Sequence, residues 1–255
     1  MRTNGATTRG PVLLACDLDG TLLDHDATPV PGVREALAEL IAAGALFVVC
    51  TGRPLRTART ATDALGVEPA VFACYHGALV ADAAGRALRH LPLPRPEAVA
   101  VTAEALTAGV SVTVWDVDEP RELEPAGAGE EPGDAVSRLV LHGEPVTIAR
   151  LLAELRREWA GRLRVEPIRP GFIGVFSPRV DKGDALRFVA ARLGVRLERT
   201  VACGDGPADE TLLAAAAVRV AVGEPPHVLG HVPDVVVTTG ARLPDTLRAL
   251  VLPLL

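Results

Sequence analysis

The chain has 255 residues, of which 49% are hydrophobic and 23% charged, and its formal net charge is −6. A chain of this size and composition can bury a substantial core, as one large domain or two smaller ones. The acidic balance and the lack of a basic run argue against nucleic acid or an anionic membrane as the main partner. Nothing in the sequence is typical of a signal peptide or a membrane span, so we expect a cytoplasmic protein.

Short apolar runs alternate with helical patterns at both ends of the chain, which indicates β-α-β units with parallel strands and helices on both faces. The helical pattern that follows Pro31 ends at Gly44, a residue type that often terminates helices. Residues 79–91 are typical of a hairpin that turns at 83–85. A helical pattern that includes Leu186 and Leu193 precedes the apolar run at 200–203. The apolar runs that predict strands are 12–16, 45–50, 70–73, 200–203, 218–222 and 235–237.

The middle of the chain follows another pattern, beginning with a proline-rich link at 91–96. We predict helices at about 97–108 and 146–159, strands at 110–116, 136–142, 162–168 and 172–176, and an acidic loop at 117–135. This αββ-αββ order indicates a smaller α+β domain inserted into a Rossmann-like α/β core. The expected division is core at 1–82, inserted domain at 83–178 and core again at 179–255.

The junction after the first strand carries the strongest functional signal. Asp17 and Asp19 stand two residues apart at the end of a buried run, and Gly20 permits the turn that follows. Two such carboxylates repel each other and lose hydration, unless a cation lies between them or one attacks while the other moves protons. Ligand sites of open α/β sheets lie at this end of the strands.

Three further strand or helix ends carry groups that chemistry can use. Thr51 offers a hydroxyl, and Gly52 lets the backbone approach an anion closely. Lys182 is the only lysine in the chain, against 25 arginines, and it gives a compact charge that arginine does not replace. Asp205 and Asp209 form a second acidic pair after a buried strand. Carboxylates, a hydroxyl and an ammonium are the groups needed for Mg²⁺-assisted phosphoryl transfer.

In this order, the four segments resemble the four motifs of the haloacid dehalogenase (HAD) superfamily. The insertion between the second and third segments resembles the cap domain of its Cof-like, type IIB phosphatases, and the resemblance covers nearly the whole chain. The sequences that carry it are Asp17-Leu18-Asp19-Gly20-Thr21, Thr51-Gly52-Arg53-Pro54, Lys182-Gly183-Asp184-Ala185-Leu186 and Gly204-Asp205 with Asp209.

The resemblance implies a role for each site residue. Asp17 is expected to attack phosphorus and form an aspartyl-phosphate, and Asp19 to act as acid and then base. Thr51, Gly52, Arg53 and Lys182 are expected to bind the phosphoryl group, which is where most of the rate enhancement arises. The expected cofactor is Mg²⁺, held by Asp17, the main-chain carbonyl of Asp19 and Asp205, with Asp209 nearby or acting through water.

Three positions depart from the motifs of the resembled family, which usually have Asn there: Ala208, His76 and Glu224. Ala208 removes an amide that would orient neighbouring groups, so metal affinity or rate is expected to be lower. His76 has the chemistry to contact substrate or respond to pH, although a single loop histidine is more often structural. The nucleophile, the acid/base group and the lysine remain, so we expect activity to survive.

The expected substrate is a small phosphorylated metabolite, such as a sugar phosphate or a related acid. The cap is expected to close over the site and contact the rest of the substrate. Its candidate contact residues are Trp115, Asp116, Arg121, Arg138, His142 and Arg169, together with the acidic loop at 116–134.

Other functions stay open at this point. A phosphomutase of the same fold and a non-catalytic phosphate- or metal-binding scaffold both remain compatible with the sequence. A metal-dependent glycosyltransferase is disfavoured, because only 16 residues precede Asp17. A nicotinamide-binding protein is disfavoured because no G-x-G-x-x-G follows a strand.

Overall fold

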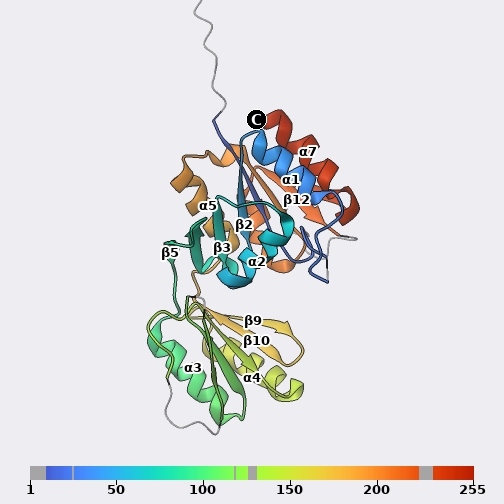
Figure 1. Cartoon of the computed structure of the whole chain (residues 1–255). Coiled ribbons are helices and arrows are strands. Elements are labelled where there is room, and N and C mark those ends of the chain that lie inside the picture. The colour runs from blue at the N-terminus through green and yellow to red at the C-terminus, as the bar shows by residue number, and fades with distance from the viewer. Residues whose placement is uncertain (1–9, 25, 118, 126–130, 224–231) are drawn as a thin grey trace, which may run out of the picture.

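The computed structural model describes residues 10–24, 26–117, 119–125, 131–223 and 232–255. The chain folds into two parts, each built on its own sheet (Figure 1). The larger part holds eight strands in the order β13-β12-β11-β1-β2-β3-β4-β5, and the smaller holds five in the order β7-β6-β8-β10-β9. This arrangement confirms the predicted α/β core with an inserted smaller α+β part.

The first sheet is parallel from β13 through β3 and antiparallel from β3 through β5. β1 lies between β11 and β2, and all five of its residues are buried, as expected for a central strand covered on both faces. The strands are β1 (Val12–Cys16), β2 (Ala45–Cys50), β3 (Val71–Cys74), β4 (Leu79–Asp82), β5 (Ala87–His90), β11 (Thr200–Gly204), β12 (Val218–Val222) and β13 (Val235–Thr238).

Helices cover both faces of this sheet, as predicted. Val12, Leu14 and Cys16 of β1 belong to the apolar cluster of α1 (Val33–Ala42), α2 (Leu55–Leu65) and α7 (Leu243–Val251). Leu13 and Ala15, which point the other way along the strand, belong to the cluster of α5 (Lys182–Leu193) and α6 (Glu210–Ala215). In Figure 1, α1 and α7 lie side by side on one flank and α5 lies on the opposite flank.

The second sheet is antiparallel throughout and carries two helices on one face. We call this part, from α3 to β10, the cap. Its apolar cluster joins both helices to alternate strand residues, such as Val112, Val114 and Leu139. Its elements are α3 (Arg95–Thr107), β6 (Ser111–Trp115), β7 (Pro120–Leu123), β8 (Arg138–His142), α4 (Pro145–Glu158), β9 (Arg164–Arg169) and β10 (Phe172–Phe176).

Two details of the predicted organisation are corrected. The hairpin at 79–91 is present, but both of its strands belong to the first sheet, so the expected start of the inserted part at residue 83 is too early. The cap elements begin with α3 at Arg95. The acidic stretch expected to be a loop contains β7, which pairs with β6 and buries only Leu123 among its four residues.

Single turns of 3-10 helix complete the chain at Tyr75–Gly77, Leu197–Arg199, Pro207–Asp209, Gly240–Arg242 and Leu252–Leu254. None of the helices in the described residues is long and apolar enough to cross a bilayer.

Candidate active site

Parallel pairing brings the predicted motifs to one edge of the first sheet. β11, β1 and β2 are parallel neighbours, so their carboxyl ends deliver Asp205, Asp17 and Thr51 to the same side. The Asp17 N–H donates to the carbonyl of Cys203 at 2.9 Å, which continues the ladder one residue beyond the strand. Asp17 is therefore held on a rigid element, and only 8% of it is exposed.

Lys182 is the first residue of α5, and its side chain is 2% exposed. Asp181 caps the helix by accepting hydrogen bonds from the N–H groups of Gly183 and Asp184, which fixes where the helix begins. The ammonium Nζ lies 3.0 Å from Oδ1 of Asp17 and 2.6 Å from Oδ1 of Asp209. The single lysine thus joins carboxylates from two different motifs.

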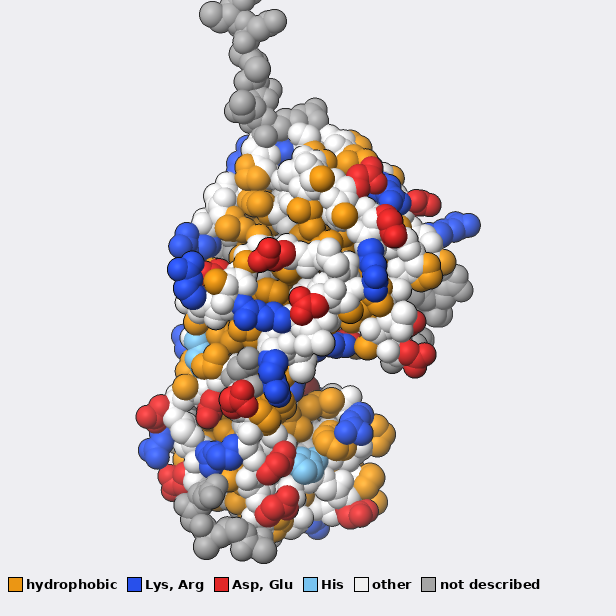
Figure 2. Space-filling model, in the orientation of Figure 1, with side chains coloured by type: hydrophobic (Ala, Val, Ile, Leu, Met, Phe, Trp, Pro, Cys, Tyr) orange, Lys and Arg blue, Asp and Glu red, His pale blue; other side chains and the backbone are white. Residues whose placement is uncertain are grey.

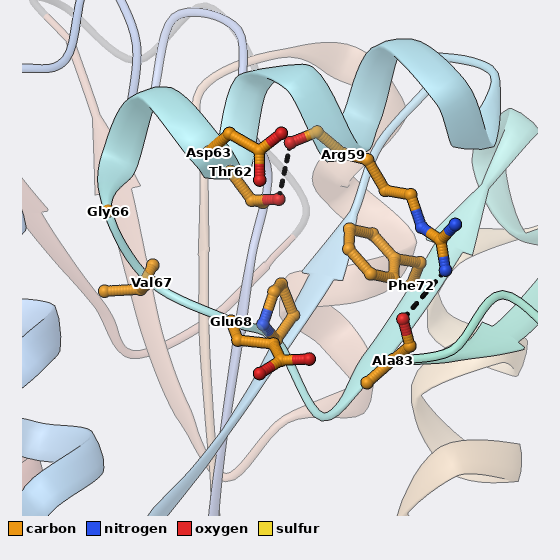
Figure 3. Close-up of a pocket in the computed structure, with 9 residues that line it drawn as sticks. Arg59, Thr62, Asp63, Gly66, Val67, Glu68, Phe72 and Ala83 are labelled. Carbon is orange, nitrogen blue, oxygen red and sulfur yellow. Dashed lines mark hydrogen bonds between the residues drawn. The ribbon is translucent and has the colours of Figure 1, made fainter.

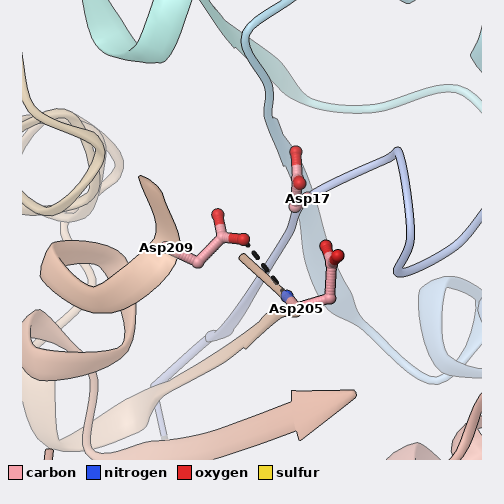
Figure 4. Close-up of side chains that lie close together, drawn as sticks. All are labelled: Asp17, Asp205 and Asp209. Carbon is pink, nitrogen blue, oxygen red and sulfur yellow. Dashed lines mark hydrogen bonds between the residues drawn. The ribbon is translucent and has the colours of Figure 1, made fainter. Parts of the chain in front are cut away.

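Asp17, Asp205 and Asp209 form an acidic cluster in which the nearest oxygens all lie within 4.8 Å of one another (Figure 4). Asp209 is oriented because Oδ2 accepts the N–H groups of Asp205 at 3.1 Å and Gly206 at 3.0 Å. The hydroxyl of Thr21 donates to Oδ1 of Asp205 at 3.1 Å. Clustered carboxylate oxygens are the ligands that hard divalent cations prefer.

Burial disfavours the ionised form of the carboxyl groups in this cluster. Burial and the nearby charge of Asp209 raise the pKa of Asp17 to about 7, although Lys182 acts in the other direction. The pKa of Asp205 is raised for the same two reasons. A bound cation would stabilise the ionised carboxylates and offset this cost.

Gly20 is needed for the close packing of the first and fourth motifs. Its φ of 77° lies in the left-handed region, and a Cβ atom there would collide with the carboxylate of Asp205. The turn after Asp19 therefore depends on glycine for both its backbone angle and its lack of a side chain.

Asp19 takes a different position from the acidic cluster. Its side chain is 53% exposed, and both carboxylate oxygens accept hydrogen bonds from the guanidinium of Arg53, with Nε to Oδ2 at 2.8 Å. Its carboxylate is not one of the clustered oxygens. A carboxylate that two hydrogen bonds hold at the cleft containing Asp17 is suited to transfer a proton to a bound ligand.

The second motif forms a compact turn after β2. The buried hydroxyl oxygen of Thr51 accepts the N–H of Arg53 at 3.1 Å, so its own O–H can donate to a ligand. The ring of His76 packs on Gly52, where any Cβ would lie 2.7 Å from ring atoms. His76 has a φ of 56°, and burial holds its pKa well below the usual value, so its ring is neutral.

A cleft of about 740 Å³ joins these groups to the cap. Figure 2 shows the molecule hollowed between its two parts. Every core residue of the predicted site lines the cleft except Thr51, which is fully buried and directly follows β2. Its core side is formed by Asp17, Asp19, Gly52, Arg53, Pro54, His76, Lys182 and residues 205–209, and its cap side by Arg138, Arg156, Glu166, Pro167, Ile168 and Phe176.

Of the six cap residues expected to contact substrate, only Arg138 lines this cleft. Arg121 donates to the Glu131 carbonyl at 2.8 Å, His142 lies 3.1 Å from Glu122, and Arg169 stacks on Phe172. Trp115 packs behind Arg138 instead, and Asp116 accepts a hydrogen bond through its carbonyl from Ser137. Arg156, Glu166 and Ile168 were missed, because only the docking of the cap brings them to the cleft.

A second hollow, of about 470 Å³, lies away from these motifs at the end of α2 (Figure 3). Arg59 crosses it and donates to the carbonyl of Ala83 at 2.8 Å, and Asp63 and Glu68 form part of its wall. None of the four sequence motifs contributes to its lining. The predicted site residues therefore gather at the cleft between core and cap and not at this hollow.

The departures from the family pattern fall in different places. Ala208 lines the cleft between Gly206 and Asp209, where it offers no polar group. His76 lines it as well, packed edge-on against Phe176 with ring centroids 5.3 Å apart. Glu224 lies outside the described residues.

Comparison with known families agrees with this architecture. The family model of the haloacid dehalogenase-like hydrolases matches residues 14–120 and 117–240. Because the match covers most of the chain, the chain belongs to the haloacid dehalogenase-like hydrolases, and the family predicted from the motifs is confirmed.

Individual relatives are distant but match along most of their length. The putative phosphatase YxeH of Bacillus subtilis is 24% identical over 241 residues, which cover 85% of this chain and 89% of that protein. Phosphoglycolate phosphatase of Methanopyrus kandleri is 28% identical over 225 residues, covering 88% and 89%.

Solved structures share the fold. TM0651 from Thermotoga maritima superposes with a TM-score of 0.81 at 19% identity, covering 94% of this chain and 98% of that one. The sugar phosphatase BT4131, of HAD subclass IIB, gives 0.72 at 19% identity, covering 94% and 97%. The predicted type IIB architecture, an α/β core with this kind of cap, is therefore confirmed at the level of the fold.

Proposed function

We propose that this protein is a Mg²⁺-dependent phosphatase that hydrolyses phosphomonoesters of small metabolites through an aspartyl-phosphate. One observation carries the proposal: the buried carboxylate of Asp17 lies 3.0 Å from Lys182, within the acidic cluster and at the wall of a substrate-sized cleft. The matched relatives named above as phosphatases support the same reaction class.

The residues present fit a magnesium ion. Asp17, Asp205 and Asp209 supply the hard oxygen atoms that Mg²⁺ prefers. The pKa values of Asp17 and Asp205 are raised, because nearby positive charge does not fully offset the burial and mutual repulsion of these carboxylates. These three side chains would hold the ion, with the main-chain carbonyl of Asp19 as a further ligand. Bound there, Mg²⁺ would neutralise charge and let a phosphate dianion approach the carboxylates.

The residues of the chain then divide the reaction between them. An oxygen of Asp17 attacks phosphorus and forms an acyl phosphate while the ester P–O bond breaks, and the leaving oxygen takes a proton from Asp19. Asp19 next removes a proton from water, which attacks phosphorus, releases phosphate and restores Asp17. Arg53 orients Asp19 through the two hydrogen bonds described above.

The phosphoryl oxygens would be bound by donors that the fold already positions. Lys182 offers its ammonium, Thr51 its hydroxyl and Gly52 its N–H, all beside Asp17 at the edge of the sheet. Fixed donors stabilise charge that develops in the transition state without reorganising during the reaction. The cap would exclude bulk water while the substrate is bound.

The test is phosphate release from p-nitrophenyl phosphate and from a panel of small phosphorylated metabolites, with Mg²⁺ or with EDTA. We expect release that requires Mg²⁺ and is abolished in Asp17→Asn. Asp63→Asn is the matched control, because it makes the same change in the other hollow and leaves the cleft untouched.

Each alternative predicts its own result. Conversion of a sugar phosphate to an isomer without phosphate release would identify a phosphomutase. Binding of Mg²⁺ and phosphate with no turnover of any compound would identify a non-catalytic protein. Undiminished release by Asp17→Asn would refute the proposed nucleophile.

A further inference from the structure

Two arginines on the cap side of the cleft carry positive charge without a carboxylate partner. Arg138 donates to the carbonyl of Gly52 at 3.2 Å, and Arg156 donates to the carbonyl of Val165 at 3.0 Å. Among the described residues, no carboxylate oxygen lies within 4.0 Å of either guanidinium. Both side chains line the cleft that contains Asp17.

The one acidic group that lines the cap side of the cleft among the described residues does not balance them. Glu166 lines the cleft, but its Oε1 accepts a hydrogen bond from Nε of Arg164 at 2.7 Å. Arg164 also donates to the carbonyl of Val180 at 2.7 Å, which fixes the pair in place. The charge of Glu166 is therefore already matched, and the cap side keeps an excess of positive charge.

Arg138 is held where water solvates it poorly. Its guanidinium lies 5.2 Å from the ring centroid of Tyr75 and 5.1 Å from that of Trp115. Its Nε is buried without a hydrogen-bond partner among the described residues, and burial lowers the pKa of this arginine. A partly desolvated cation without a counterion is unfavourable unless an anion approaches it.

On the core side of the cleft, in contrast, the positive side chains are paired with carboxylates. Arg53 is paired with Asp19, and Lys182 is paired with Asp17 and Asp209. These paired groups lie where the transferring phosphoryl group would bind. Arg138 and Arg156 line the same cleft from the cap side, together with the apolar residues Pro167, Ile168 and Phe176, and their charges are not matched by a carboxylate there.

We propose that Arg138 and Arg156 bind a second anionic group, so that the substrate is a phosphomonoester whose alcohol part carries a carboxylate or a second phosphate. The proposal rests on the phosphatase function proposed above and narrows its substrate class. Guanidinium groups suit both anions, because their N–H groups match the paired oxygens of carboxylate and phosphate.

The experiment compares kcat/KM within two pairs of compounds that differ mainly in the second anion. One pair is 3-phosphoglycerate and glycerol 3-phosphate, and the other is fructose 1,6-bisphosphate and fructose 6-phosphate. We expect the wild type to prefer the compound with the second anion by about tenfold or more in at least one pair. The pair that shows the preference distinguishes carboxylate from phosphate.

The variants are Arg156→Gln and Arg138→Gln, with Arg157→Gln as the control. Arg157 is the next residue of α4, is exposed and does not line the cleft. Each of the first two variants should lower the preference about 10- to 100-fold, while activity on p-nitrophenyl phosphate falls much less. A variant that only disturbed cap packing would lower kcat/KM equally for both compounds of a pair and leave the ratio of the two values unchanged.

The inference would be overturned by a kcat/KM ratio near one in both pairs, or by a preference that survives both arginine variants. Neither result would contradict the proposed phosphatase function. Absence of release even from p-nitrophenyl phosphate would instead contradict the proposed function. In that case, calorimetric binding of the same pairs to Asp17→Asn measures the preference without turnover. Equal binding of both members would again overturn the inference.

Discussion

Replacing Lys182 by methionine tests the charge network at the centre of the site. Methionine keeps an unbranched apolar stem of similar length but removes the ammonium that lies 2.6 Å from Asp209 and 3.0 Å from Asp17. At an effective dielectric constant of about 20, each contact contributes roughly 5 to 6 kcal/mol of gross attraction. Much of this is cancelled by the desolvation of the ammonium, whose side chain is 2% exposed.

The variant leaves two buried carboxylates facing each other without a counterion. Breaking a buried pair in this way typically costs about 3 to 5 kcal/mol, so we expect a loss of that size in the free energy of unfolding at pH 7.5. Urea unfolding in EDTA, followed by circular dichroism, measures it. Arg157→Met, an exposed change on α4, should alter stability by no more than about 0.5 kcal/mol.

The pH dependence separates charge from packing. Without the lysine, the pKa of Asp17, already about 7, should rise further, so the folded variant holds protons that the unfolded chain releases. Its deficit relative to wild type should therefore shrink as the pH falls from 8 to 5. A deficit below about 1 kcal/mol, or one that does not change with pH, would refute the reasoning.

Three further changes test neighbouring groups. Burial holds the pKa of His76 well below its usual 6.5, so the stability that its neutral ring contributes is complete above pH 6.5 and is lost on acidification. His76→Asn should therefore lose less stability than the wild type between pH 6.5 and 5 in urea unfolding, and parallel pH profiles would contradict this. Gly20→Ala should weaken Mg²⁺ binding at least about tenfold by calorimetry because its Cβ displaces Asp205, whereas Gly10→Ala, with no atom within 4 Å, should bind normally. Arg53→Gln should lower kcat about tenfold or more by freeing Asp19, and an unchanged kcat would show that this orientation is unimportant.

The sequence suffices to predict which core residues lie together at one edge of the first sheet, because the determinants of that placement are local. Two neighbouring apolar runs end directly at predicted site residues, Asp17 and Thr51, and parallel pairing brings these ends together without further information. The ion pair between Lys182 and Asp209 needs only that arrangement and a helix that begins at the lysine.

What the sequence leaves open depends on contacts between distant segments. The hairpin at 79–91 is evident from its turn, but only its pairing with β3 assigns it to the first sheet. β7 has charged residues at two of four positions, so its sequence lacks the alternation that reveals strands. Arg156 and Ile168 are exposed residues that no sequence motif marks, and they line the cleft only because of where the cap is docked.

The return of the chain from the cap has a consequence for repeated turnover. β10 ends at Phe176, and the helix that begins with Lys182 follows after a short connection. Asp181 anchors that helix through its own N-terminal N–H groups, independently of any cap residue. The carbonyl of Val180, in the connection between β10 and α5, accepts a hydrogen bond from Arg164 of β9, so this connection is tied to the cap. If the cap moves during the proposed reaction, that contact can break without disturbing the hydrogen bonds that fix the start of α5, and the position of Lys182 does not depend on it.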